Sequence, residues 1–245
     1  MREKFYLIAG PCAVESEKQI LEISKFLKDK GIKYLRGGSF KHRTNPDAFQ
    51  GLGKEGIKFL MKAKERTGMK IVSEILDVRD IRLFKDVDII QIGARNSQNF
   101  PLIKEVAKTS KIILLKRGFG NTIDEWISTS KYIVKEGNKN IIMCCRGIRT
   151  FENEMRNSAD IDAIPIVKKK TGFPVVFDPS HSAGRKDLVV PLSKAAIAIG
   201  CDGLLIEVHN KPEEALSDNK QQLNFEEFEE LLEEIKPYLE LRGLI

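Results

Sequence analysis

Short apolar runs recur along the whole chain, and they repeatedly end in a polar or charged residue. The run at 173–177 is followed by Asp178 and His181, and the run at 203–206 is followed by Glu207. Amphipathic stretches of helical length separate the runs. Parallel strands buried on both faces read as such continuous Val, Ile and Leu runs, and polar residues at their carboxyl ends are typical of a barrel with its site on one rim. The alternation therefore predicts an α/β fold with a closed parallel sheet.

Strand and helix pairs account for nearly the whole length of the chain. Strands are expected at 5–9, 32–35, 70–73, 88–92, 111–115, 140–143, 173–177 and 203–206. Helices are expected at about 17–30, 53–66, 78–84, 101–108, 122–136, 160–170, 188–199 and 225–239. The 245 residues match the roughly 250 of a typical (β/α)8 barrel. We therefore predict a single (β/α)8 TIM barrel, with residues 1–245 as one catalytic domain.

Composition and charge distribution argue against nucleic acid and membranes as binding partners of this protein. The net charge is +6, from 41 basic and 35 acidic residues, and the basic residues are spread out rather than gathered around aromatic ones, which argues against nucleic acid. No apolar run approaches the roughly 18 residues that a membrane span needs, and the amino terminus shows no signal-peptide pattern. Of the four cysteines, Cys144, Cys145 and Cys201 are interpreted as reduced thiols. We expect a cytoplasmic protein that contacts neither membrane nor nucleic acid.

Basic residues follow four of the expected strands. They are Arg36, Arg95, Lys116 and Arg146, and the long loop at 39–51 adds Lys41 and Arg43. In a barrel the carboxyl ends of the strands converge on one mouth. Cations brought together there need a multiply charged anion, and Arg binds phosphate oxygens bidentately. The pattern favours a phosphorylated small molecule as ligand.

A second polar set lies at the same expected rim. It consists of Cys12, His181, Glu207 and Asp218. A thiolate, an imidazole and two carboxylates suit one divalent metal ion such as Mn, Fe, Co or Zn, and strands one, seven and eight become neighbours when a barrel closes. Two simpler interpretations stay open, since Cys12 can be a small buried hydrophobe and His181 a hydrogen-bonded loop residue. We interpret His209 as structural.

Motifs spread over essentially the full length resemble those of a known family. They are Ala9-Gly-Pro-Cys-Ala-Val-Glu-Ser16, Leu35-Arg-Gly-Gly-Ser-Phe-Lys-His-Arg-Thr44, Gln91-Ile-Gly-Ala-Arg-Asn96, Leu115-Lys-Arg-Gly118, Cys145-Arg-Gly-Ile-Arg-Thr150, Asp178-Pro-Ser-His-Ser182 and Ile206-Glu-Val-His209. The chain resembles the 3-deoxy-D-arabino-heptulosonate 7-phosphate (DAHP) synthases, in particular their short microbial branch without a regulatory domain. The resemblance implies condensation of phosphoenolpyruvate with erythrose 4-phosphate, the first step of aromatic amino-acid biosynthesis, with release of phosphate.

The resemblance also implies roles for individual residues. The metal ligands would be Cys12, His181, Glu207 and Asp218. The residues that hold phosphoenolpyruvate would be Arg36, Lys41, Arg95, Lys116 and Arg146, and those that hold the sugar phosphate Arg43 and Thr44. Glu74 or Lys41 would position a water molecule or move its proton, so the expected catalytic residues are Lys41, Glu74, Cys12 and His181. A homodimer or homotetramer insensitive to phenylalanine and tyrosine is expected.

Two departures from the family pattern and three rival functions remain. His42 stands where the sugar-phosphate motif usually has proline, and Cys145 stands where the sixth-strand motif usually has glutamate. The nearest rival is the sister synthase that uses arabinose 5-phosphate to make an eight-carbon sugar, but the Arg43-Thr44 pair favours the heptulosonate. The others are a Schiff-base aldolase acting through Lys116 and a non-catalytic sugar-phosphate sensor.

Overall fold

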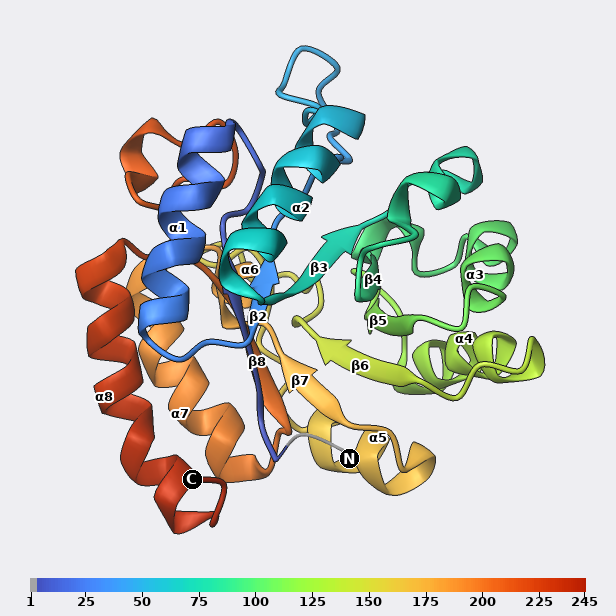
Figure 1. Cartoon of the computed structure of the whole chain (residues 1–245). Helices are drawn as coiled ribbons and strands as arrows, with labels where there is room; N and C mark the ends of the chain where they lie inside the picture. Colours follow the sequence, from blue (N-terminus) through green and yellow to red (C-terminus); the bar gives the residue numbers. More distant parts are fainter. Residues whose placement is uncertain (1–3) are drawn as a thin grey trace.

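Eight parallel strands pair in chain order, and the ring closes because β8 pairs with β1 (Figure 1). The computed structural model describes residues 4–245. The strands are β1 (Tyr6–Gly10), β2 (Tyr34–Arg36), β3 (Lys70–Glu74), β4 (Ile89–Ile92), β5 (Ile112–Lys116), β6 (Ile141–Cys145), β7 (Val175–Phe177) and β8 (Gly203–Glu207). This confirms the (β/α)8 barrel predicted from the sequence.

Helices surround the strands (Figure 1). The α-helices are α1 (Glu17–Asp29), α2 (Lys54–Thr67), α3 (Phe100–Ala107), α4 (Ile123–Lys135), α5 (Ala163–Thr171), α6 (Pro179–Ala183), α7 (Val189–Ile199) and α8 (Phe225–Leu241). Short 3-10 helices are η1 (Val78–Phe84), η2 (Ala94–Asn96), η3 (Lys186–Leu188) and η4 (Pro212–Glu214). The expected helix between β3 and β4 is thus a 3-10 helix, and α6 was not predicted. Within residues 4–245, no helix combines the length and apolarity that crossing a membrane requires.

The helices begin where side-chain caps allow them to begin. The Ser16 hydroxyl accepts a hydrogen bond from the backbone N–H of Gln19 at the start of α1. Thr122 and Glu125 form a reciprocal capping box at the start of α4, which satisfies two backbone donors that the helix leaves unpaired. Both starts agree with the sequence prediction.

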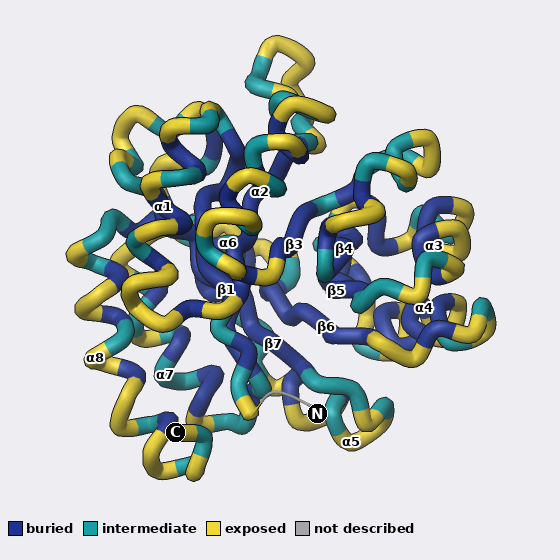
Figure 2. Tube along the Cα trace, viewed as in Figure 1, coloured by how far each residue is buried: buried dark blue, intermediate teal, exposed yellow. Residues whose placement is uncertain are grey.

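Alternating side chains divide the core into two parts. On β5, Leu114 points into the barrel and Leu115 points toward the surrounding helices. On β6, Cys144 lies inside and Cys145 outside in the same way, because successive strand residues face opposite sides. The strands are accordingly mostly buried, apart from the exposed Lys70 at the start of β3, while the outer surfaces of the helices are exposed (Figure 2).

The inner layer of apolar residues determines where the polar site lies. Val72, Leu114 and Leu205 belong to this inner layer. Two residues further along each strand, on the same face, come Glu74, Lys116 and Glu207. The inner-layer residues of β2, β6 and β7 are Tyr34, Cys144 and Val176. Two residues after each of them come Arg36, Arg146 and Asp178. The site is therefore the next layer of the barrel interior, on an apolar floor.

The long loop after β2 has its own internal support. The backbone N–H of Lys41 donates to the carbonyl of Gln50 at 2.8 Å, and the Gln50 amide donates to the carbonyls of Asn45, Pro46 and Ala48. The loop, which carries Lys41, Arg43 and Thr44, projects beyond the amino-terminal end of α2 (Figure 1). These contacts fold it into a defined turn at the barrel mouth.

Candidate active site

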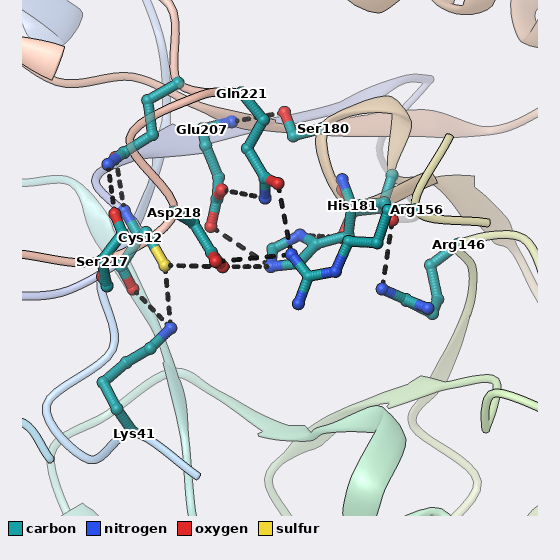
Figure 3. A network of polar contacts seen from close by, with 12 residues as sticks. Cys12, Lys41, Arg146, Arg156, Ser180, His181, Glu207, Ser217, Asp218 and Gln221 are labelled. Carbon is teal, nitrogen blue, oxygen red and sulfur yellow. Dashed lines mark hydrogen bonds and ion pairs between the residues drawn. The ribbon is translucent and has the colours of Figure 1, made fainter. Parts of the chain in front are cut away.

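Four potential metal donors meet at the seam between β7, β8 and β1. One ligand atom from each of Cys12, His181, Glu207 and Asp218 lies within 4.8 Å of the others. Cys12 Sγ is 3.3 Å from Asp218 Oδ2, and His181 Nε2 is 3.4 Å from Glu207 Oε1 and 3.6 Å from Asp218 Oδ2 (Figure 3). One sulfur, one imidazole nitrogen and two carboxylates form a donor set that fits a divalent transition metal. The four residues singled out in the sequence therefore form one cluster.

Local structure explains how the four side chains converge. Gly10 at the end of β1 pairs with Glu207 at the end of β8. Cys12 lies two residues beyond Gly10, so this strand pairing brings Cys12 close to Glu207. His181 lies in the short helix α6, not in an open loop. Asp218 has a positive φ of 49°, a left-handed conformation that Asp tolerates better than most residues, and this turn directs its carboxylate toward Cys12.

Both oxygens of Glu207 are already engaged by protein groups. Oε1 is 2.5 Å from Nη1 of Arg36, and Oε2 accepts a hydrogen bond of 2.7 Å from the Gln221 amide. Burial opposes ionisation of this carboxyl, but His181 and Arg36 hold its pKa below the ordinary value. Burial raises the pKa of the Cys12 thiol to about 12, and the Glu207 charge acts in the same direction. Glu207 is therefore a fixed, ionised donor.

We expect the Gln221 amide to support metal binding, because it fixes the second oxygen of Glu207. Replacing Gln221 by leucine keeps most of the volume but leaves that oxygen unpaired. Loss of such a supporting contact typically weakens metal affinity by about 10- to 100-fold, and Gln221→Leu should do the same in a competition titration with a chromophoric chelator. Asn219 lies on the same loop and is exposed, so the control variant Asn219→Ala should bind metal with the affinity of the native protein. Unchanged affinity of Gln221→Leu would contradict the role.

Asp178 links the metal cluster to the cationic side of the site. Its Oδ2 is 2.5 Å from Lys116 Nζ and 2.8 Å from His181 Nδ1, and its Oδ1 caps α6 by accepting from the His181 N–H. Burial raises the pKa of Asp178, yet His181 and Lys116 together hold it well below the usual range. Burial lowers the pKa of His181. With Nδ1 facing Asp178, Nε2 of His181 is directed to the other donors.

A cavity of about 290 Å³ opens onto the donor cluster. Its cationic lining residues are Lys41, Arg43, Arg95, Lys116, Arg146 and Arg156. Within the described part of the chain its acidic lining residues are Glu74 and Asp218. Burial lowers the pKa of Arg146 to about 10, and Nη1 of this buried side chain has no hydrogen-bond partner in residues 4–245. Excess positive charge and an unpaired guanidinium nitrogen are what a site for a polyanion requires.

The cavity contains most of the residues named from the sequence. Nine of them line it, namely Lys41, Arg43, Thr44, Glu74, Arg95, Lys116, Arg146, His181 and Asp218. Cys12, Arg36 and Glu207 are instead fully buried beside it. Arg36 pairs with Glu207 and also approaches the carbonyl of Cys12 at 3.5 Å. Its guanidinium therefore supports the donor cluster directly, whatever ligand the cavity holds.

Glu74 reaches the cavity only because its neighbour is glycine. The Gln91 amide donates to Glu74 Oε2 at 3.0 Å. A Cβ atom on Gly93 would lie 1.8 Å from Glu74 Oε1, so any other residue would displace this carboxylate. The glycine after β4 is thus part of the site.

Three residues of the site were not identified from the sequence. Arg156 lines the cavity, donates from Nη1 to the side-chain oxygen Oε1 of Gln221 at 3.2 Å and lies 3.4 Å from Asp218 Oδ1 (Figure 3). Phe119 lines the cavity as well. Arg156 could have been found as a cation on the loop after β6, whereas Gln221 carries no chemical signature in a sequence. Cys145, one of the departures, lies outside the cavity, with its thiol 3.2 Å from the Asp160 carbonyl.

A (β/α)8 barrel that joins a metal-type donor cluster to a cationic cavity defines an enzyme of the class that acts on phosphorylated small molecules. The sequence profile of the DAHP synthetase I family matches residues 2–241. A Thermotoga maritima protein named phospho-2-dehydro-3-deoxyheptonate aldolase is 50% identical over 241 residues, covering 98% of this chain and 71% of its own length. The chain belongs to the DAHP synthetase I family.

Further relatives and solved structures agree with this family. A Geobacter sp. strain M21 protein named 2-dehydro-3-deoxyphosphooctonate aldolase is 33% identical over 249 residues, covering 94% of this chain and 90% of its own. The crystal structure of the T. maritima DAHP synthase superposes with a TM-score of 0.95 at 50% identity, covering 98% of this chain and 70% of that one. Its truncated form gives 0.91 at 48% identity, covering 98% and 88%.

Proposed function

We propose that this chain condenses phosphoenolpyruvate with erythrose 4-phosphate and water to give DAHP and phosphate, which opens the pathway to aromatic amino acids. The observation that carries the proposal is the cationic cavity opening directly onto the donor cluster. The heptonate aldolase of T. maritima, at 50% identity, supports the choice of product. Both substrates are polyanions, which the excess of cationic side chains suits.

One divalent metal ion would be held by Cys12, His181, Glu207 and Asp218. When bound, such an ion supplies Lewis acidity that polarises a carbonyl oxygen. Sulfur and imidazole donors together with carboxylates suit Mn, Fe, Co or Zn, and availability decides among them. The rest of the reaction depends on the side chains around the cluster.

We assign the phosphoenolpyruvate contacts to the deep cations and the sugar phosphate to the loop. Arg95, Lys116 and Arg146 line the cavity and follow β4, β5 and β6. They can hold a phosphate and a carboxylate together, with Lys41 at the far side, and Arg36 acts beside Glu207. Arg43 and Thr44 lie on the loop after β2 at the cavity rim. Fixed cations stabilise developing charge without having to reorganise.

The chemistry joins two carbon atoms and breaks one carbon–oxygen bond. The methylene carbon of phosphoenolpyruvate attacks the aldehyde carbon, and water adds to the enol carbon. The bond from that carbon to the phosphate oxygen then breaks and phosphate leaves. Glu74 lines the cavity and can accept the proton of the water, while the Lys41 ammonium, 2.9 Å from Cys12 Sγ, can deliver a proton to the aldehyde oxygen.

The rival functions have less support. A Schiff-base nucleophile needs a free amine, whereas Nζ of Lys116 is engaged in an ion pair 2.5 Å from the buried carboxylate of Asp178. The arabinose 5-phosphate synthase remains the nearest rival, because the octonate aldolase relatives are about one-third identical. We further propose one domain over residues 1–245, a cytoplasmic location and a homodimer or homotetramer; light scattering tests the last.

Substrate choice is tested by following phosphoenolpyruvate loss with metal-loaded protein. Erythrose 4-phosphate and arabinose 5-phosphate are offered in parallel, each with and without chelator. We expect chelator-sensitive turnover with the four-carbon sugar. Preference for the five-carbon sugar would assign the chain to the rival synthase, and binding without turnover of either sugar would leave a sensor.

Arg43 should determine affinity for the sugar phosphate. Losing one hydrogen-bonded charged contact costs about 1.5–3 kcal/mol, so Arg43→Ala should raise KM for erythrose 4-phosphate by about 10- to 100-fold. KM for phosphoenolpyruvate should change little. Arg66→Ala, an exposed arginine in the last turn of α2, is the matched control. An equal rise in both KM values would show that Arg43 supports the loop as a whole.

A further inference from the structure

Three arginine side chains gather around a single aromatic ring at the cavity wall. The guanidinium carbons of Arg95, Arg146 and Arg149 lie 5.2, 4.8 and 4.6 Å from the centroid of the Phe119 ring. They come from separate segments, after β4 and after β6, while Phe119 follows β5. The backbone N–H of Arg149 also donates to the Phe119 carbonyl at 2.8 Å. One ring thus joins three cations that are far apart in the sequence.

Such a cluster of like charges needs a source of attraction within the protein itself. Arg95 and Arg146 face further like charge from Arg156, which acts with burial to lower the pKa of Arg95. Acidic partners for these guanidinium groups are few, since Glu74 and Asp218 are the acids that line the cavity in the described chain. Nη1 of Arg146 is buried and unpaired within residues 4–245. The negative face of an aromatic ring attracts cations within about 6 Å.

We propose that Phe119 is a positioning residue that holds Arg95 and Arg146, which line the cavity, ready for the anionic groups of phosphoenolpyruvate, while Arg149 packs against the same ring. The proposal rests on the function proposed above. A carboxylate could hold the same arginines, but its charge would repel a phosphate and cancel the field that attracts it. An aromatic ring orders the guanidinium groups without adding net negative charge. The arginines therefore stay ordered and keep their full positive charge for the substrate.

The test changes the electrons of the ring while keeping its shape. Phe119 is replaced, by site-specific incorporation, with phenylalanines that carry one, two, three or five ring fluorines, which progressively withdraw density from the ring face. Calorimetry with metal-free protein then measures the dissociation constant for phosphoenolpyruvate. We expect that constant to rise with each step, to about tenfold for the fully fluorinated ring and for Phe119→Leu. Phe119→Trp should bind at least as well as the native protein.

Controls separate this electronic role from packing. Phe151, fully exposed on the neighbouring loop, provides Phe151→Leu, which should leave binding unchanged. Kinetically, KM for phosphoenolpyruvate should follow the fluorine series while KM for erythrose 4-phosphate stays constant. A dissociation constant that ignores fluorination, or that rises equally with tryptophan and leucine, overturns the proposal. If the native protein binds no phosphoenolpyruvate, the proposed function fails instead, and inorganic phosphate titrated across the same series still tests the role of the ring.

Discussion

Cys12→Ala is expected to abolish measurable condensation while leaving the barrel folded. The thiol is fully buried between Lys41 and Asp218, and it is the sulfur donor of the proposed metal site. Substitutions outside the ligand shell already cost about 10- to 100-fold, so loss of the donor itself should cost more than about 100-fold in turnover. A second measurement is independent of activity. Metal at about 100 times its dissociation constant stabilises the folded state by about 2.7 kcal/mol, and Cys12→Ala should lose this stabilisation.

Cys201 supplies the control for this variant. It is also buried, but it precedes β8 and so lies at the opposite end of the barrel from the donor cluster. Cys201→Ala should keep both turnover and the metal-induced rise in Tm. If Cys12→Ala retains that rise, Cys12 is no metal ligand, and the simpler interpretation as a small buried hydrophobe prevails.

Asp178→Asn is expected to cost the metal-free protein about 3 kcal/mol of unfolding free energy. Asparagine keeps the shape and can still cap α6, so the change removes only the negative charge. Among the described residues, Lys116, 2.5 Å from Asp178 and almost fully buried, then has no ionised partner at that distance. Breaking a buried ion pair from one side typically costs 3–5 kcal/mol. Urea denaturation in the presence of chelator measures the change without a contribution from bound metal.

A second substitution tests whether the unpaired charge of Lys116 causes the loss of stability in Asp178→Asn. Adding Lys116→Met removes the stranded charge, so the double variant should regain most of the lost stability. Asp187→Asn is the surface comparison, because Asp187 forms an exposed pair with Arg185, and such pairs contribute little. A double variant no more stable than Asp178→Asn would mean that Asp178 acts through the helix cap and His181 instead.

The barrel was predictable because its signal is repeated. Each strand is a short apolar run buried on both faces, and helix starts such as Ser16 and Thr122 carry capping residues. The errors fall where tertiary context decides. Nothing in 78–84 distinguishes a 3-10 helix from an α-helix. The sequence after Asp178 gives no sign of a helix. In the structure the Asp178 carboxylate caps this segment, which forms the short helix α6.

Site residues at strand ends were predictable for a geometric reason. Glu74, Lys116 and Glu207 each lie two residues beyond an inward-facing apolar residue, so the period of a strand directs them to the mouth. Residues that support them from loops have no such register. Gln221 and Phe119 contribute by what they contact, and their neighbours come from distant parts of the chain. The pairing of Arg36 with Glu207 also follows only from barrel closure.

The pairing of β8 with β1 has a consequence for the order of events during synthesis. Cys12 and Asp218 are 206 positions apart and meet only across this seam. A growing chain on the ribosome exposes Cys12 long before His181, Glu207 or Asp218 has been made. Until those residues are made, Cys12 is the lone member of the proposed ligand set. If these four residues bind a metal ion, as proposed above, the ion would bind only after β8 has paired with β1, and it would then stabilise that pairing against opening.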